Sequence, residues 1–247
     1  ESPHRTTSLG LDKGARAAAK GKLDDNSPQG LARRTAKTQA ALKELAAFDD
    51  ASLSPAAKLN REVVTYTQSQ QIVAPTQFGL SSVQRPYRIF QQGGAYFQVP
   101  AFLNTAHSIA TKEDCDAYLS RLEAFATNLD TDSAVQKAEA ARGYLAPAWS
   151  IDLTLGQMAK LREQPAATSS TTQSLVKRAA AKGIAGDWQA QAAKLLDSKV
   201  YPALDRQIAL MKELRASSKP GDGLWRVPKG AEIYAAALNQ ATTTDFT

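Results

Sequence analysis

The sequence predicts an all-α protein, built as an elongated multi-helix domain. Three observations support this fold class. Hydrophobic residues make up 43% of the 247 residues and aromatic residues only 7%, with alanine and leucine dominant, which favours helix over sheet. Serine–proline pairs, which cap and begin helices, stand at residues 27–28 and 54–55. Apolar residues then recur at helical spacing through much of the chain.

The two serine–proline pairs predict a helical hairpin. Ser27-Pro28 should begin a helix that runs to about Phe48, and Ser54-Pro55 should begin a second. The second helix should end at Ala74-Pro75, because the residue before a proline resists the helical conformation. Since the connection between them is short, the two helices should pack antiparallel.

Further helices are expected along the rest of the chain. Thr111 and Asp114 match a capping box, followed by apolar residues at helical spacing to Phe125. We expect further helices over residues 132–142, 147–161, 174–182, 187–214 and 232–240. Pro202 should kink the helix that contains it. The final stretch, Thr242–Thr247, is rich in β-branched residues and should be extended.

One segment differs from its charged surroundings. Between Val63 and Thr111 the only formal charges are Arg85 and Arg88, and the rest is rich in glutamine and tyrosine. Uncharged but hydrogen-bonding sequence suits an interior wall or a cleft lined by fixed polar groups. We therefore treat residues 1–247 as a single helical region that contains an uncharged, cleft-lining segment at 63–111.

Within this segment a small β element is possible near residues 84–99. Two aromatic, β-prone runs flank Gly93-Gly94 and could pair as a hairpin. An irregular loop is the alternative.

The same segment holds the candidate binding residues. A guanidinium in uncharged surroundings needs an acceptor. Arg85 and Arg88 could each form an ion pair with a carboxylate elsewhere in the fold, or hold a substrate carboxylate in a bidentate way. Tyr87, Gln91 and Tyr96 are further candidates for substrate contact, although aromatic packing would also account for the tyrosines.

Composition argues against several classes of protein. The net charge is +6, but basic and acidic residues are interleaved and no nucleic-acid-binding motif occurs, so we expect no nucleic-acid partner. No apolar run reaches 18 residues, so we expect no membrane span. Cys115 is the only cysteine, which excludes an intrachain disulfide, and its place on an apolar helix face predicts a buried thiol.

Known catalytic motifs are absent. A zincin helix needs two histidines one turn apart, but the only histidines are His4 and His107, and we expect His107 to be structural. No phosphate loop, dinucleotide-binding turn or nucleophile elbow occurs. We therefore assign no metal ligand and no catalytic residue within this chain.

Several segments, in order over most of the chain, resemble the bacterial family called domain of unknown function 885. The segments that carry the resemblance are Arg85-Pro86-Tyr87, Gly94-Ala95-Tyr96-Phe97, Val99-Pro100-Ala101-Phe102-Leu103, Asp116-Ala117-Tyr118-Leu119-Ser120-Arg121-Leu122, Val200-Tyr201-Pro202-Ala203-Leu204-Asp205 and Ala241-Thr242-Thr243-Thr244-Asp245.

Members of that family are typically more than twice this long, mostly helical and often exported. Their second half carries a His-Glu-x-x-Pro-Gly-His-His motif that resembles a zinc peptidase centre. The resemblance implies that this chain is the N-terminal half of a larger helical, metallopeptidase-like fold. Zinc would be bound by a C-terminal segment or second chain, which would be the main partner, and the substrate would be a peptide or related amide. The alternative is a non-catalytic helical protein that binds peptides or acts as a scaffold.

The expected location also depends on the resemblance. The first residues lack an apolar signal core. Since the family is often exported, we expect a periplasmic or secreted mature chain from which a signal has been removed, while a cytoplasmic location stays open.

Overall fold

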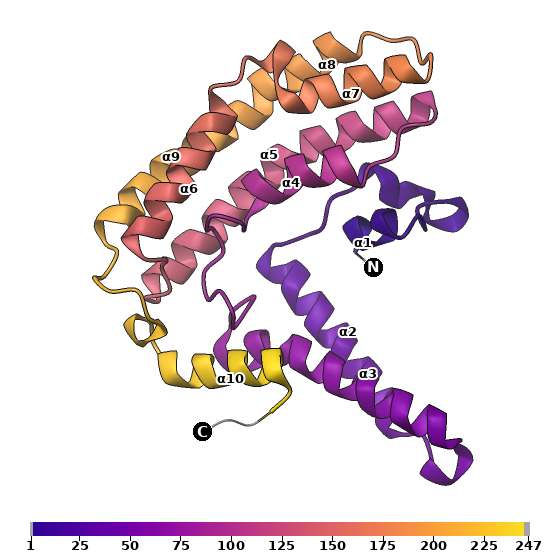
Figure 1. Ribbon diagram of the computed structural model, residues 1–247, viewed down its shortest axis with the longest axis vertical. Helices are drawn as coiled ribbons and strands as arrows, with labels where there is room; N and C mark the ends of the chain where they lie inside the picture. The colour runs from indigo at the N-terminus through magenta and orange to yellow at the C-terminus, as the bar shows by residue number, and fades with distance from the viewer. Residues whose placement is uncertain (1, 245–247) are drawn as a thin grey trace.

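The computed structural model describes residues 2–244 and confirms the all-α fold (Figure 1). Its α-helices are α1 (Pro3–Ser8), α2 (Pro28–Ala46), α3 (Pro55–Val73), α4 (Ala95–Thr105), α5 (Lys112–Ala141), α6 (Ala148–Arg162), α7 (Ser170–Ala181), α8 (Trp188–Leu195), α9 (Tyr201–Ala216) and α10 (Gly230–Thr242). Short 3-10 segments are η1 (Gly14–Gly21), η2 (Asp50–Ser52), η4 (Ala166–Thr168) and η6 (Leu224–Arg226), and π turns are η3 (Ala74–Phe78) and η5 (Leu196–Val200). None of the helices in residues 2–244 is both long and apolar enough to cross a membrane.

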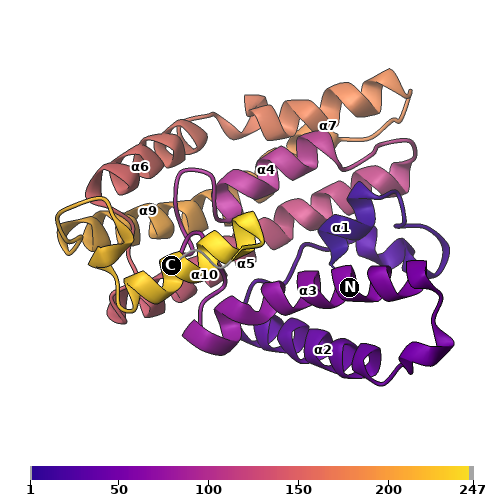
Figure 2. The same ribbon diagram turned by 60° about the horizontal axis from the view of Figure 1, so that its bottom comes forward.

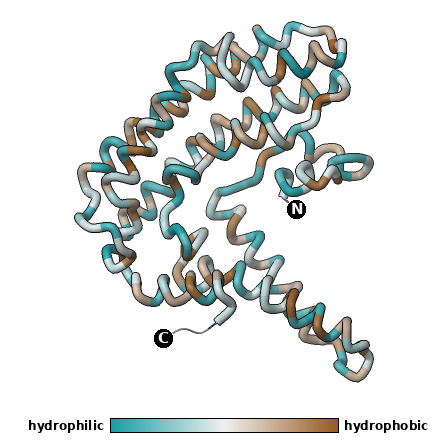
Figure 3. The backbone as a smooth tube through the Cα atoms, viewed as in Figure 1, coloured by the Kyte–Doolittle hydropathy of each residue, from teal (hydrophilic) through white to brown (hydrophobic). Residues whose placement is uncertain are grey.

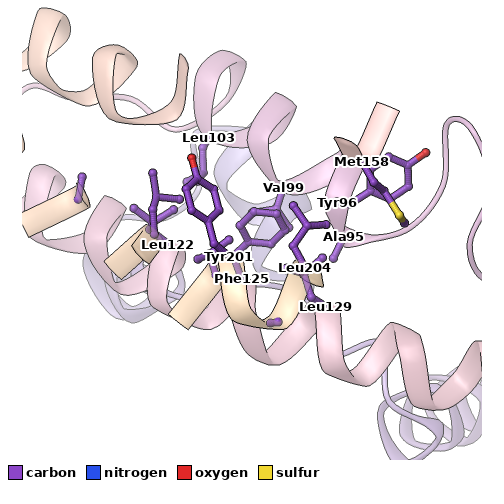
Figure 4. Close-up of a cluster of buried hydrophobic side chains, with 14 of the residues drawn as sticks. Ala95, Tyr96, Val99, Leu103, Leu122, Phe125, Leu129, Met158, Tyr201 and Leu204 are labelled. Atoms are coloured by element: carbon purple, nitrogen blue, oxygen red, sulfur yellow. The ribbon is translucent and has the colours of Figure 1, made fainter. Parts of the chain in front are cut away.

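The main hydrophobic core forms where α4 and α9 pack against α5 and α6 packs against α9 (Figures 1 and 4). Each of these helices contributes buried side chains at helical spacing, as amphipathic helices in a layered domain do. The side chains labelled in Figure 4 include Val99 and Leu103 of α4, Leu122, Phe125 and Leu129 of α5, Met158 of α6, and Tyr201 and Leu204 of α9. A second, smaller core joins η3 and the loop after it to α10, through Phe78, Leu80, Val83, Val227 and Ile233.

Helix α5 is a single element, and the expectation of a separate helix at 132–142 is wrong. The capping box of Thr111 and Asp114 is confirmed at its start, and Gly143, with φ of 89°, follows its end. No glycine or proline interrupts residues 126–131, and Leu129 keeps the apolar face buried through that stretch. The 30-residue helix therefore runs the length of the body.

Two prolines are accommodated by π turns. Helix α3 ends at Val73, as the Ala74-Pro75 pair predicts, and continues into η3. The predicted helix at 187–214 is divided into α8 and α9 by η5, which ends two residues before Pro202. Because proline has no N–H to donate and its ring crowds the preceding turn, a wider turn fits it better than a regular α-helical one.

The possible β hairpin at 84–99 does not form, and residues 84–94 form the irregular loop that was the alternative. The only β pairing in residues 2–244 is an isolated bridge between Phe90 and Gly93, and the second aromatic run is the start of α4. Gly94 adopts φ of 99°, which suits a residue without a Cβ and turns the chain into that helix.

The prediction that residues 242–247 are extended is wrong for the first two of them. Thr242 closes α10 and Thr243 is left-handed, with φ of 58°, so neither is extended. The rest of the predicted extended stretch reaches residues 245–247, which lie outside the described residues.

The predicted antiparallel hairpin of α2 and α3 is present, and it projects from the body (Figures 1 and 2). Of all the residues in these two helices, only Gly30 is buried. The hairpin meets α10 through polar contacts, with Gln70 Nε2 donating to Asn239 Oδ1 at 2.9 Å and Gln240 Nε2 to the Gln70 carbonyl at 3.2 Å. Apolar residues recur along the projecting helices (Figure 3).

A buried arginine fixes the N-terminal segment to α5. Arg121 is fully buried, and its guanidinium donates to the Lys22 and Ala19 carbonyls, at 2.9 and 3.1 Å, and to Thr7 Oγ1 at 2.5 Å. It also lies 4.7 Å above the Phe102 ring. Burial lowers the pKa of Arg121 to about 10, so it stays charged at neutral pH. One side chain thereby connects α1, η1, α4 and α5.

We predict that Arg121→Ala lowers the free energy of unfolding by about 3–5 kcal/mol, because it leaves buried acceptors without a donor and opens a cavity. Urea unfolding measures the loss, and hydrogen exchange should increase first in residues 3–22. The matched control is Arg206→Ala, which removes an exposed pair with Asp130 and should cost less than about 1 kcal/mol. Equal losses in the two variants would contradict this role for Arg121.

Candidate functional site

The uncharged segment is fixed to α5 by three buried polar side chains. Asp132, Gln136 and Glu139 follow one another at helical spacing and form what we call the polar face of α5. This face accepts hydrogen bonds from backbone N–H groups of the segment at 2.7 Å from Arg88 to Glu139, 2.8 Å from Ile89 to Gln136, and 2.6 Å from Ala95 to Asp132. A loop without regular structure is therefore fixed by side chains instead of by strand pairing.

Arg88 forms an ion pair with a carboxylate of the fold, which is one of the two roles that the sequence predicts for it. Its Nε donates to Asp132, whose side chain is fully buried, while the Arg88 side chain is 15% exposed. Its Nη2 is also buried and has no hydrogen-bond partner in residues 2–244. The ion pair leaves that N–H group unsatisfied, which is costly in a buried position.

A cavity of about 220 Å³ lies beside this pair, and Arg88 and Glu139 both line it. The start of α2 bounds it at Ser27, and Arg142 bounds it at the end of α5. Arg142 donates to the carbonyl oxygens of Gly79, at 2.8 Å, and Phe78, at 2.6 Å, and so fixes the end of η3. The cavity thus lies between α2, α5 and the loop of residues 79–94.

The polar face has unusual protonation behaviour. Burial raises the pKa of Glu139 to about 7, although the Arg88 N–H and the charges of Arg88 and Arg142 oppose the shift. Burial also raises the pKa of Asp132, against the opposing effect of Arg88. Glu139 is therefore poised to change its protonation state near neutral pH.

The other predicted binding residues lie around Phe90. The Arg85 guanidinium is 5.9 Å from the centre of that ring, and Tyr87 packs edge-on against it at 6.0 Å. The buried Tyr96 hydroxyl is 2.8 Å from the Phe90 carbonyl oxygen, and Gln91 is the half-buried residue that follows Phe90. Burial raises the pKa of Tyr96 to about 12, so its hydroxyl stays protonated. Arg88 alone of the five lines the cavity, and their role in substrate contact stays a prediction.

Neither histidine fits a zinc site. His107 is buried, its Nε2 lies 2.8 Å from the Asp114 carbonyl and its Nδ1 lies 2.7 Å from Arg121 Nη1, so both ring nitrogens are engaged. Burial lowers its pKa to about 4, so the ring is neutral at pH 7. His4 stacks on Phe102, and residues 2–244 hold no group of three or more potential metal ligands. Cys115 is fully buried, as predicted.

The polar face of α5 was not identified from the sequence, although a signal exists. The core-facing positions Leu122, Phe125 and Leu129 are followed, at steps of three and four residues, by Asp132, Gln136 and Glu139. Polar residues that continue an apolar helical stripe are candidates for buried hydrogen-bonding groups.

The fold and this site define an elongated all-α protein in which a buried acid–amide helix face holds an ordered loop. The chain belongs to the family described as "Bacterial protein of unknown function (DUF885)", which matches residues 3–247. It is similar to a solved structure described as "the putative lipoprotein from Colwellia psychrerythraea", with a TM-score of 0.90 and 17% identity. The similarity covers 99% of this chain but 43% of that one, so this chain spans less than half the length of that protein. No curated protein matches the chain.

We predict that Arg88→Gln lowers the free energy of unfolding by about 3–5 kcal/mol, because it leaves the buried Asp132 carboxylate without its cation. Arg85→Gln is the matched control, since Arg85 is exposed and its guanidinium contacts the adjacent Gln84 carbonyl and the Phe90 ring, with no buried carboxylate among these partners. It should change stability by less than about 0.5 kcal/mol. Urea unfolding at pH 7 measures both, and an unaffected Arg88→Gln protein would show that the pair is not structural.

A second prediction concerns Glu139 and pH. The unfolded side chain titrates near 4.5 and the folded one near 7, so between these values the folded state binds more protons and stability falls as pH rises. Glu139→Gln keeps the acceptor for the Arg88 N–H and removes the titration. We expect it to stabilise the protein by about 2–3 kcal/mol at pH 8 and by much less at pH 5. Unfolding measured at both pH values tests this, and a pH-independent difference would contradict it.

Proposed function

We propose that this chain is the N-terminal, substrate-cleft part of a zinc-dependent, peptidase-like hydrolase whose metal site lies on a further, C-terminal segment. The observation that carries the proposal is an uncovered apolar stripe on α3. Leu59, Val63 and Tyr66 are 60%, 56% and 38% exposed and repeat at four and three residues, on one side of the helix. Such a stripe in a helix with no buried residue calls for a covering partner.

The stripe lines a groove of about 630 Å³ between α3 and α10. Besides Leu59, Val63 and Tyr66, it is lined by one carboxylate, Glu62, and by uncharged polar side chains such as Gln70 and Gln240. An apolar floor with amide groups at its side suits a packed protein segment. We propose that the rest of a longer polypeptide covers this groove, because this chain matches only 43% of the length of the similar lipoprotein structure.

In this proposal the chain binds and orients the substrate. The described residues do not fit a zinc ion, so we assign the zinc ligands and the hydrolytic chemistry to the further segment. The loop around Phe90 offers an exposed arginine, Arg85, and the half-buried Tyr87 and Gln91 as contacts for a peptide or related amide. Because the polar face of α5 fixes this loop, its side chains are held in place before substrate binds.

The proposed location is outside the cytoplasm, in the periplasm or secreted. It is supported by the description of the similar structure as a lipoprotein.

We predict that the full-length protein binds zinc at one equivalent or more and hydrolyses members of a peptide library, and that a chelator removes both. Elemental analysis and a mass-spectrometric peptide assay measure the two. A full-length protein that binds no metal and cleaves no peptide would contradict the proposal and favour the non-catalytic peptide-binding or scaffold protein.

Matched variants test the apolar stripe in the same protein. Val63 lies in the groove, whereas its neighbour Val64, 43% exposed, does not line it. Val63→Asp should therefore loosen the covering segment and lower peptide hydrolysis, while Val64→Asp should leave it within about twofold of the unmodified protein. Equal effects of the two substitutions would show that the groove is not covered.

A further inference from the structure

The cavity between α2, α5 and the 79–94 loop has an excess of positive charge. Three guanidinium groups line it, from Arg34, Arg88 and Arg142, but Glu139 is the only carboxylate that residues 2–244 contribute to its lining. Arg88 is neutralised by Asp132 behind the cavity wall. With Glu139 ionised the lining therefore keeps one net positive charge, and with Glu139 protonated it keeps two.

The protein partners of the other two arginines do not cancel this charge. Arg142 donates to the carbonyl oxygens of Phe78 and Gly79, and Arg34 donates to the Asp25 carbonyl. Carbonyl oxygens satisfy N–H groups but carry no formal charge. A guanidinium has five N–H donors, so both side chains also keep donors beyond these bonds.

Arg88, one of the three arginines, also has a donor atom without an acceptor in the described part of the chain. Arg88 Nη2 is buried and makes no hydrogen bond within residues 2–244, although its Nε is bound to Asp132. The Asp132 bond restrains the guanidinium, so little further ordering is needed when an acceptor arrives.

The size of the cavity limits what it can hold. At about 220 Å³ it is smaller than the 300–1,000 Å³ typical of sites for whole small molecules. It suits an acidic group with a few attached atoms, while exposed residues at its edge, Arg34, Gly79 and Ser81, leave a path to solvent. A singly charged carboxylate matches the single net charge better than a phosphate dianion, which would also approach Glu139.

We propose that this cavity binds the carboxylate group of a small ligand or of a peptide C-terminus, through Arg34, Arg88 and Arg142. The site depends only on residues of this chain and does not require the proposed hydrolysis. Its test measures binding alone, so the failure of one proposal can be told from the failure of the other.

The probe is N-acetylalanine, with N-acetylalaninamide as a neutral analogue of nearly the same shape. Titrated into the full-length protein at pH 7 and followed by calorimetry, the acid should bind and the amide should bind at least about tenfold more weakly. Inorganic phosphate should also bind more weakly than the acid. Equal binding of acid and amide would overturn the site, and tighter binding of phosphate would overturn its assignment to carboxylates.

Neighbouring arginines provide the matched variants. Arg34→Gln removes a cavity cation and should weaken binding of N-acetylalanine about tenfold. Arg33→Gln removes the next residue, which pairs with Asp25 and does not line the cavity, and should change binding less than twofold. Both side chains are exposed, so neither change should affect folding. Equal effects of the two variants would overturn the assignment.

A third variant tests the opposing charge. The charged groups facing Glu139 are Arg88, Arg142 and Asp132. Glu139→Gln removes a carboxylate from the lining and should tighten binding of N-acetylalanine a few-fold at pH 8. Weaker binding in this variant would show that Glu139 itself holds the ligand, against the proposed arrangement.

Discussion

The structure depends on one set of interactions, the hydrogen bonds from backbone N–H groups of Arg88, Ile89 and Ala95 to the polar face of α5. These bonds replace the strand pairing that the 79–94 loop does not make. The loop in turn connects the α2–α3 hairpin and η3 to α4 and the main core. Asp132 has two roles, because it accepts the Ala95 N–H and also forms the ion pair with Arg88. The position of the loop and the charge on α5 are therefore coupled.

Apolar packing and buried polar groups stabilise different parts of the molecule. The helices around α5 bury their apolar faces in the usual way, and the buried polar groups Asp132 and Arg121 fix the connecting segments to that body. The α2–α3 hairpin has no comparable core of its own; it is joined to the second core through η3 and Val73 and makes polar contacts with α10. An extended arm of this kind is stable only when its helices support each other or a partner covers them.

Most of the helices could be predicted from the sequence because their signals are local. Ser27-Pro28, Ser54-Pro55 and the Thr111 capping box each mark a boundary within a few residues. Local preference alone could not decide against the possible β hairpin, because a long-range contact decides the structure there. The Ala95 N–H donates to Asp132, and a helix begins at this residue instead of a strand. Among the candidate residues, Arg88 has its partners Glu139 and Asp132 at 51 and 44 residues away in the sequence, where no local pattern connects them.

The π turn at η5 has a consequence for the longest helical run after α5. A π turn contains one extra residue, which rotates everything beyond it by about 100° around the helix axis compared with an uninterrupted α-helix. The segment before the turn, α8, packs against α7, and the segment after it, α9, packs against α6. The extra residue therefore rotates the buried side of the helix between α8 and α9, so that the two segments face different neighbours. A deletion of one residue between Leu196 and Val200 would turn the apolar side of α9 away from α6.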